Sequence, residues 1–194
     1  MDAYTYLDRT LAKYAGSFDI LKPYRACGVE YDAYASYLSQ DEKYVLTRKA
    51  NLWTVRSHEH VLFRIADDLS EEMIEHAETV IKEHMIPDLV CRGERYPEKD
   101  HMYSYLTFVF ICNHSPSQAT SEQLRSYRFT QNFLFTFRGY AEAHLILVDL
   151  EKEQVYTNRD ARQMKKFFLS TFEEVRRGMA GYEENCGKVI PFPR

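Results

Sequence analysis

Residues 102–112 read MYSYLTFVFIC, the longest apolar stretch of the chain. Apolar or aromatic side chains occupy both alternating sets of positions, interrupted only by Ser104 and Thr107. A strand that is apolar on both faces is covered on both sides, whereas a strand at a surface alternates apolar with polar residues. The stretch therefore predicts a central strand with a layer of structure on each face. It is too short to span a membrane, which takes about 20 residues in a helix.

Amphipathic helices are predicted to supply those layers. Apolar residues recur every three or four positions over about 69–85, after the capping-box sequence Asp68-Leu69-Ser70-Glu71, and Pro87 is predicted to end this helix. Further helices are predicted at about 2–15, at 120–127, and from Asn158, as the cap, to about Arg177, with Gly178 as the stop.

The remaining strands are predicted from alternating polarity and from extended apolar runs, at about 29–37, 43–55, 61–65, 129–137, 145–150 and 155–157. Turns are predicted at the polar stretches 39–42, 56–59 and 151–153. Within 129–137 four phenylalanines share one parity, Phe129, Phe133, Phe135 and Phe137. We expect these and most other aromatic residues to pack on the sheet and in the core.

The strands come in blocks and do not alternate strictly with helices. This order predicts an α+β fold with a central mixed or mostly antiparallel sheet of six or seven strands, flanked by amphipathic helices. A length of 194 residues fits one domain, residues 1–194, with an irregular tail at about 181–194.

Composition and charge restrict the function. Only seven glycines are present, and the glycine-rich phosphate-binding motifs do not occur, so the common nucleotide-dependent enzymes are not expected. The net charge of −4 makes nucleic acid an unexpected partner. The N-terminus lacks the basic and apolar regions of a secretory signal, which predicts a cytoplasmic protein. The four cysteines show no zinc-binding spacing, and no cofactor is predicted.

Glu142, His144 and Asp149 form the first candidate site. Metal-dependent nucleases bind a divalent ion with clustered carboxylates, usually with a lysine nearby. Glu142 and His144 would point to the same side of a strand, whereas Asp149 has the opposite parity. The alternative is that Asp149 opens a turn and Glu142 lies at a strand edge.

Histidines give a second, weaker candidate. His58 and His60 share one parity around Glu59, and His101 and His114 follow later in the chain. No set of ligands with metal-binding spacing can be identified, so we predict no metal site and expect surface histidines. His84 lies on the apolar side of its helix and is expected to be partly buried with its hydrogen bonds satisfied.

The charges are distributed unevenly. The helix at 69–85 carries five glutamates and one lysine, whereas the last helix carries six basic and three acidic residues. Basic residues Arg125, Arg128 and Arg138 could extend the positive side. Either the surface is polarised to dock an acidic partner, or both are ordinary solvated helix faces. Tyr34 and Trp53 are the aromatic residues whose parity favours a ligand pocket.

Two segments resemble a family of uncharacterised bacterial proteins. They are YVLTRKANLW at 44–53, and the stretch from Val148-Asp149-Leu150 to Val155-Tyr156-Thr157-Asn158-Arg159. The resemblance covers about residues 28–170. The family has no assigned activity, so the resemblance implies no functional residues and only a bacterial, intracellular setting.

Three functions remain open from the sequence. The leading hypothesis is a binding or interaction module without catalytic activity, with a protein partner or a homodimer as alternatives. The second is a metal-dependent hydrolase or nuclease-like enzyme that uses Glu142 and Asp149. The third is a small-molecule binder with an aromatic-lined pocket.

Overall fold

A mixed sheet lies at the centre of the structure, a computed structural model that describes residues 1–43 and 53–186 and the side chains of residues 1–39 and 56–178. Its seven strands are, in spatial order, β1 (Asp19–Leu21), β4 (Ala33–Lys43), β5 (Trp53–Ala66), β6 (His101–Cys112), β8 (Tyr140–Asp149) and, both paired with β8, β7 (Thr130–Asn132) and β9 (Gln154–Thr157). The pairs β5–β6 and β6–β8 are parallel and the other pairs are antiparallel. The predicted fold class is confirmed.

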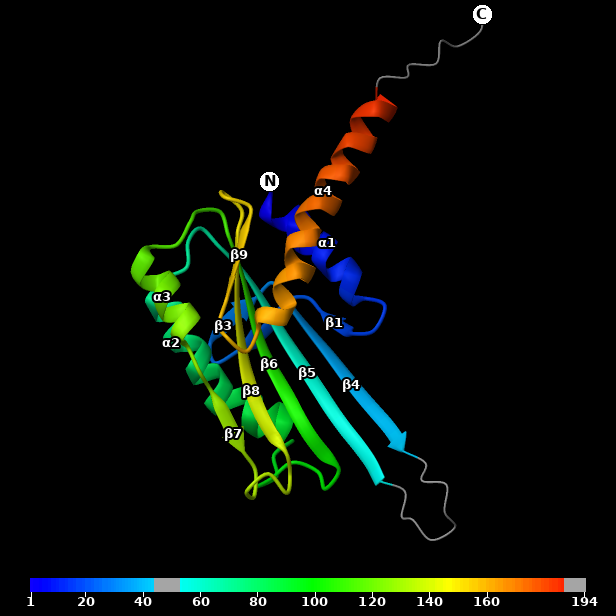
Figure 1. Ribbon diagram of the computed structural model, residues 1–194, viewed down its shortest axis with the longest axis vertical. Coiled ribbons are helices and arrows are strands. Elements are labelled where there is room, and N and C mark those ends of the chain that lie inside the picture. Colours follow the sequence, from blue (N-terminus) through cyan, green and yellow to red (C-terminus); the bar gives the residue numbers. More distant parts are fainter. Residues whose placement is uncertain (44–52, 187–194) are drawn as a thin grey trace, which may run out of the picture.

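Helices cover both faces of this sheet (Figure 1). One layer contains α1 (Ala3–Tyr14) and α4 (Lys165–Cys186), which follows the short 3₁₀-helix η2 (Arg162–Met164). The other contains α2 (Glu71–Val80), the π-helix η1 (Ile81–Val90) and α3 (Gln118–Ser126), and a small hairpin of β2 (Tyr24–Ala26) and β3 (Val29–Tyr31) also packs there. The predicted N-terminal helix is confirmed, with the Asp2 side chain accepting a hydrogen bond from Thr5 N.

β6 separates two hydrophobic cores, as its sequence predicts. Leu106, Phe108 and Phe110 pack against the α2–η1–α3 layer, and Val109 and Ile111 pack against the α1–α4 layer. These five side chains are at most 2% exposed. Burial on both faces explains why this strand carries almost no polar residue in its second half.

Pro87 does not end the helix that starts at Ser70, so that prediction is wrong. The Ser70 side chain caps α2, two residues after Asp68, the N-cap of the predicted capping box, and the chain continues past Val80 as a π-helix that contains Pro87 and ends at Val90. A π-helix pairs each amide with the carbonyl five residues earlier, as Cys91 N does with Ile86 O at 2.9 Å. This wider winding accommodates a proline that lacks an amide proton.

Two predicted turns are also wrong. Residues 39–42 and 56–59 lie within β4 and β5, which pair continuously from Ala33 opposite Phe63 to Lys43 opposite Trp53. The backbone ladder satisfies both strands whatever their side chains are, and an uncovered sheet face tolerates polar residues. An extended stretch is also predicted at 43–55, but residues 44–52 lie outside the part of the chain that the structure describes. The predicted turn at 151–153 is confirmed between β8 and β9.

The predicted strand at 129–137 is reduced to the three residues of β7. Leu134, Phe135 and Thr136 have φ values of 47°, 51° and 71°, so the backbone turns back on itself in the left-handed region. Only Phe133 of the predicted inward set is fully buried, whereas Phe135 and Phe137 are 93% and 85% exposed. We call residues 134–137 the Phe loop.

Gly139, with a φ of 72°, closes the turn that follows the Phe loop. A Cβ there would lie 2.1 Å from Met102 O, so only glycine allows this approach of the backbone to β6. The next residue, Tyr140, starts β8.

α4 extends further than predicted. The prediction of an irregular tail from residue 181 is wrong up to Cys186, where the described part of the helix ends. Gly178 does not end this helix. A glycine within a helix costs about 1 kcal/mol but does not remove a hydrogen bond. None of the helices that the structure describes is long and apolar enough to cross a bilayer.

The α1–α4 layer covers only part of its face of the sheet. In Figure 1 these helices lie over the upper half, and the lower halves of β4, β5, β6 and β8 have no helix in front of them. The apolar core residues on this face accordingly come from the later parts of the parallel strands, such as Val61, Val109 and Ile146. The earlier residues of the same parity form an uncovered face, and its side chains are mostly polar or aromatic.

Candidate functional site

The structure does not bring Glu142 and Asp149 together. They lie near opposite ends of β8, seven residues apart, which is about 23 Å along a strand, and their parity directs them to opposite faces. Asp149 is fully buried, where it accepts hydrogen bonds from Ser115 Oγ at 2.9 Å and Lys152 N at 3.0 Å. It therefore acts as a turn residue, as the alternative interpretation held.

The histidines of β5 are buried, so the expectation of surface histidines is wrong for them. The centre of the His58 ring lies 6.0 Å from that of His60 and 5.9 Å from that of His101. All three residues are at most 7% exposed. His114 is exposed. His84, as predicted, is partly buried and bonded, to Tyr24 Oη and to Asp88.

This histidine array is not arranged as a metal site. His101 Nδ1 donates to Arg138 O at 2.7 Å, so its Nε2 accepts from Ser104 Oγ at 2.8 Å, and neither nitrogen is free. Burial lowers the pKa of His58 to about 4 and that of His60 to about 3, which keeps both rings neutral near pH 7. Among the described residues no group of three or more His, Cys, Asp or Glu side chains could hold a metal ion.

Tyr34 packs in the core on the side of the α2–η1–α3 layer. Its side chain is 6% exposed, its ring stacks on Tyr24 at 4.5 Å, and its hydroxyl bonds to His60 Nδ1 at 2.7 Å. The side chain of Trp53 lies outside the described side chains.

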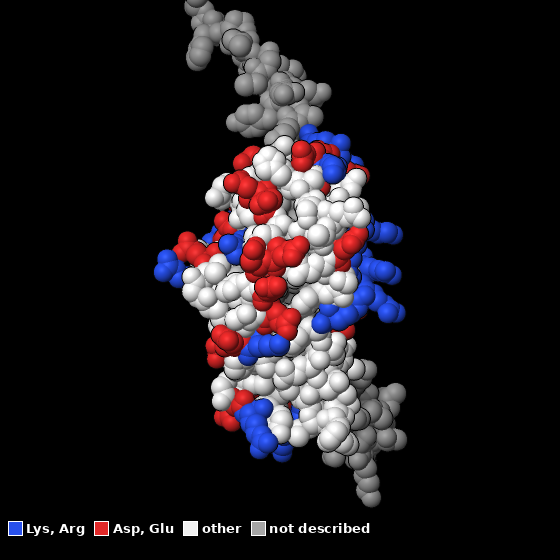
Figure 2. Space-filling model, turned by 90° about the vertical axis from the view of Figure 1, so that its left-hand side faces the viewer, with Lys and Arg blue, Asp and Glu red and all other residues white. Residues whose placement is uncertain are grey.

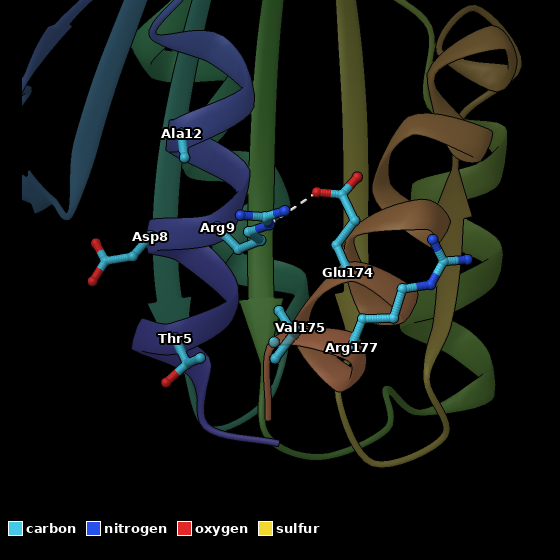
Figure 3. Close-up of a pocket in the computed structure, with 8 residues that line it drawn as sticks. Thr5, Asp8, Arg9, Ala12, Glu174, Val175 and Arg177 are labelled. Carbon is cyan, nitrogen blue, oxygen red and sulfur yellow. Dashed lines mark hydrogen bonds and ion pairs between the residues drawn. The ribbon is translucent and has the colours of Figure 1, made fainter. Parts of the chain in front are cut away.

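A long groove runs between α1 and α4, with a volume of about 700 Å³ (Figure 3). Its lining carries both charges, and Arg9 Nε binds Glu174 Oε2 across it at 2.9 Å. Lys13 also reaches Glu174, at 3.2 Å. These ion pairs tie the two helices together, and the groove presents no unpaired charge of the kind that a ligand would select.

The uncovered sheet face has a more distinctive pattern. Tyr37 of β4 pairs with Glu59 of β5, Glu59 pairs with Tyr105 of β6, and Tyr105 pairs with Glu142 of β8. Paired residues of neighbouring strands point to the same side of a sheet. These four side chains therefore form a row across four adjacent strands in which tyrosine and glutamate alternate. We call them the Tyr–Glu row.

Further aromatic side chains extend this row. Tyr103 and Tyr140, also paired, lie one step further along β6 and β8. The Tyr103 ring is 4.7 Å from that of Tyr105 and 6.2 Å from that of Tyr140. Tyr37 at the other end of the row is 38% exposed. The uncovered face thus offers tyrosine rings around two carboxylates.

Glu59 also lines a pocket at the border between this face and the helices. The pocket has a volume of about 260 Å³ and is lined by Lys13, Tyr14, Ser17, Phe18, Glu59, Met164 and Phe167. The Tyr14 ring contacts Phe18 and Phe167 edge-on, at 4.6 and 5.2 Å, and Phe18 contacts Tyr37 at 5.3 Å. We call this the Glu59 pocket.

The carboxylate of Glu59 has no hydrogen bond or ion pair to any described residue. Burial raises its pKa. Lys13 does not neutralise it, because Lys13 Nζ is bound to Phe167 O, Ser170 Oγ and Thr171 Oγ1 at 2.8–3.1 Å and to Glu174. A half-buried carboxylate without a partner is unfavourable by itself. With aromatic rings beside it, it has the chemistry of a site for an ammonium or guanidinium group.

Glu142 differs from Glu59 because it has a partner. His144 Nε2 lies 3.1 Å from Glu142 Oε1, and the ring of Tyr105 lies 4.7 Å from that of His144. Burial lowers the pKa of His144, which is 1% exposed. Of the residues proposed from the sequence, Glu142 and His144 are therefore neighbours at this site, and Asp149 is elsewhere.

The sequence did not single out Glu59, because this residue belongs to the stretch 56–59 that is predicted as a turn. The alternation of tyrosine and glutamate runs across strands and not along one, so no short motif reveals it. The only signal was that Glu59 shares parity with Val61 and Phe63.

The fold defines a three-layer protein with one partly uncovered sheet face and a pocket that contains the half-buried Glu59 carboxylate. Residues 2–170 match the family model described as Domain of unknown function (DUF8052), and the chain belongs to this family. The expectation of an uncharacterised family is thus confirmed, and the match includes the Tyr–Glu row and the Glu59 pocket. The comparisons with curated proteins and with solved structures gave no match.

Proposed function

We propose that this protein is a binding module whose uncovered sheet face receives a basic segment of a protein partner, with one lysine or arginine side chain in the Glu59 pocket. The single observation that carries this proposal is the half-buried Glu59 carboxylate, which has no partner among the described residues and lies beside Tyr14, Phe18 and Phe167. A bound cation would compensate the charge beside the rings of Tyr14 and Phe18, whereas the Lys13 ammonium already lies 4.2 Å from the centre of the Phe167 ring.

The size of the pocket supports a side chain as the ligand. At about 260 Å³ it is smaller than the usual 300–1,000 Å³ of a small-molecule site, a size that suits one charged group with its aliphatic stem. Glu142, the second carboxylate of the Tyr–Glu row, lies two strands from Glu59, a separation of about 10 Å. A peptide with more than one basic residue could reach both.

The Phe loop supports a protein partner over a free amine. Phe135 and Phe137 are almost completely exposed, and a large apolar side chain held at a surface is typical of an interaction site. The loop leads into Tyr140, which by strand spacing lies about 12 Å from Glu59. A peptide of four or five residues spans that distance.

A cytoplasmic, reducing compartment is part of the proposal. Cys27, Cys91 and Cys112 are all unpaired, as is usual where thiols stay reduced.

An NMR titration with N-acetyl-lysine methylamide tests the pocket. We expect shift changes at Glu59, Tyr14 and Phe167, and none with N-acetyl-norleucine methylamide, which has the same stem without the charge. Glu59→Gln should remove the response, whereas Glu122→Gln, an exposed residue of α3, should keep it. Equal responses to the two amides, or an unchanged response in Glu59→Gln, would overturn the proposal.

A further inference from the structure

A second pocket lies at the junction of α3, β9 and the start of α4, away from the Tyr–Glu row. Its volume is about 470 Å³, and its lining comprises Arg125, Gln154, Val155, Tyr156, Thr157, Arg159, Arg162 and Lys165. We call it the basic pocket. Figure 2 shows the face of the molecule that carries α2 and α3, with acidic side chains across its middle and basic side chains along one edge.

The lining of the basic pocket contains four basic residues and no acidic one. No ion pair between described residues includes Arg125, Arg159, Arg162 or Lys165. The neighbouring carboxylates have other basic partners, since Asp160 lies 3.9 Å from Arg128 Nε, and Glu153 lies 3.3 Å from Arg176 Nη2. The positive charge of this pocket is therefore not balanced within the described part of the chain.

One wall of the pocket is well defined. The Arg125 guanidinium lies 5.2 Å from the centre of the Tyr156 ring, and the Tyr156 hydroxyl donates to Gln154 Oε1 at 3.1 Å. Asn158 fixes the turn that carries Arg159, because its Oδ1 accepts from Leu145 N and Ala161 N. Arg125 thus comes from a segment more than 30 residues earlier and joins the basic residues that precede and begin α4.

The position of the charges is unfavourable for the fold alone. Lys165 is the first residue of α4, and the first turn of this helix contains no acidic residue. The N-terminal end of a helix carries partial positive charge and favours acidic residues. Basic residues at this end cost stability, which suggests that they serve a ligand.

We propose that the basic pocket binds a multiply charged phosphate-bearing group. Three arginines offer planar, forked donors that match phosphate oxygens, and Lys165 adds a fourth positive charge. The volume is sufficient for one or two phosphate groups. The group could belong to a free phosphate ester or to a phosphorylated side chain of a protein, because both present the same dianionic oxygens.

Calorimetric titration with pyrophosphate tests this site. We expect saturable binding that weakens about tenfold or more in Arg162→Gln, because an arginine–phosphate contact is a charge-assisted hydrogen bond. Lys166→Gln is the matched control, since Lys166 is exposed next to Lys165 but does not line the pocket, and it should change affinity less than about twofold. If both variants lose affinity for pyrophosphate to the same extent, the binding is only unspecific attraction to positive charge, and the proposed site is wrong.

Lys165→Gln separates binding from folding. Because Lys165 lies at the positive end of α4, its neutralisation should raise the melting temperature without ligand and also reduce the response to pyrophosphate. A variant that loses stability and keeps pyrophosphate binding would contradict the proposal.

Two further titrations identify the source of the phosphate. A phosphoserine peptide that binds more tightly than pyrophosphate, and much more tightly than its serine counterpart, indicates a protein side chain. Tighter binding of pyrophosphate indicates a free phosphate compound. If single-stranded oligothymidine binds more tightly than either and is equally weakened by Lys166→Gln, the positive surface is a general nucleic-acid surface, and the proposed pocket is wrong.

Discussion

Glu59 lies directly opposite Tyr105 across the parallel pair β5–β6, on the face of the sheet that the helices leave uncovered. Tyr37 flanks Glu59 on the other side, so the carboxylate is enclosed between two tyrosines of neighbouring strands. The Glu59 pocket adds rings from α1 and α4 above it. The proposed function depends on this placement of one charge among aromatic rings.

Replacing Glu59 by Gln should stabilise the protein while it removes cation binding. Burial raises the pKa of this carboxyl, so the folded state favours the protonated form, and stability falls as pH rises through the folded-state pKa. A neutral amide avoids this cost, and we expect a gain of about 0.5–1 kcal/mol in the free energy of unfolding at pH 7. Urea denaturation of both proteins measures it, and a loss of stability would show that the carboxylate has a structural partner.

The Phe loop should contribute to peptide binding but not to amine binding. The double variant Phe135→Ser, Phe137→Ser is expected to bind a peptide that has a lysine between leucines about tenfold more weakly. The reason is that the two exposed phenylalanines no longer cover the apolar surface of the peptide. Its affinity for N-acetyl-lysine methylamide should stay unchanged. If peptide affinity is also unchanged, or if both affinities fall together, the loop is not a separate contact.

The buried histidines should make stability depend on pH between about 6.5 and 4. Burial lowers the pKa of His58 to about 4, so the unfolded chain takes up a proton at pH values where the folded chain does not. Stability therefore falls as pH falls below the ordinary value of 6.5, by up to about 1.4 kcal/mol per pH unit for each such histidine. Denaturation curves at several pH values measure this slope.

The variant His58→Gln should flatten that slope, and His114→Gln should not, because His114 is exposed. The lowered pKa of a carboxyl such as Glu174 affects stability as pH falls through its ordinary value of 4.5, so the histidine contribution is measured from the slope between about pH 6.5 and 5.5. Equal slopes in the two variants would mean that His58 takes up its proton in the folded state.

Asn158→Ala should destabilise the protein by about 2–4 kcal/mol. The side chain is fully buried, accepts from Leu145 N and Ala161 N, and donates to Ala143 O at 3.0 Å. Its removal leaves several buried backbone groups without partners. The free energy of unfolding measures the effect, and a loss below about 0.5 kcal/mol would show that water replaces these bonds.

Much of the fold follows from the sequence. The run at 102–112 correctly indicates a strand covered on both faces, and the apolar periodicity that begins at Leu69 correctly indicates α2. Local patterns fail where tertiary pairing decides the structure. The polar stretch 56–59 is a strand because β4 and β6 both pair with it, and Phe135 is exposed because the chain turns back before it.

The candidate site could be predicted only in part for the same reason. Glu142 and His144 share parity on one strand, so their proximity follows from the sequence. The alignment of Glu59 with Tyr37 and Tyr105 depends on the register of two strand pairs, which a single sequence does not reveal.

The most direct test is a measurement of the Glu59 pKa by carbon-13 NMR of the side-chain carboxyl, with and without saturating N-acetyl-lysine methylamide. Without ligand, the pKa should lie above the ordinary value of 4.5, because the carboxylate is half-buried and has no partner in the described part of the chain. With the amide bound, an ammonium group beside the carboxylate should lower it clearly. A Glu59 pKa that stays the same at saturation, or one that changes equally with the norleucine amide, would contradict the account.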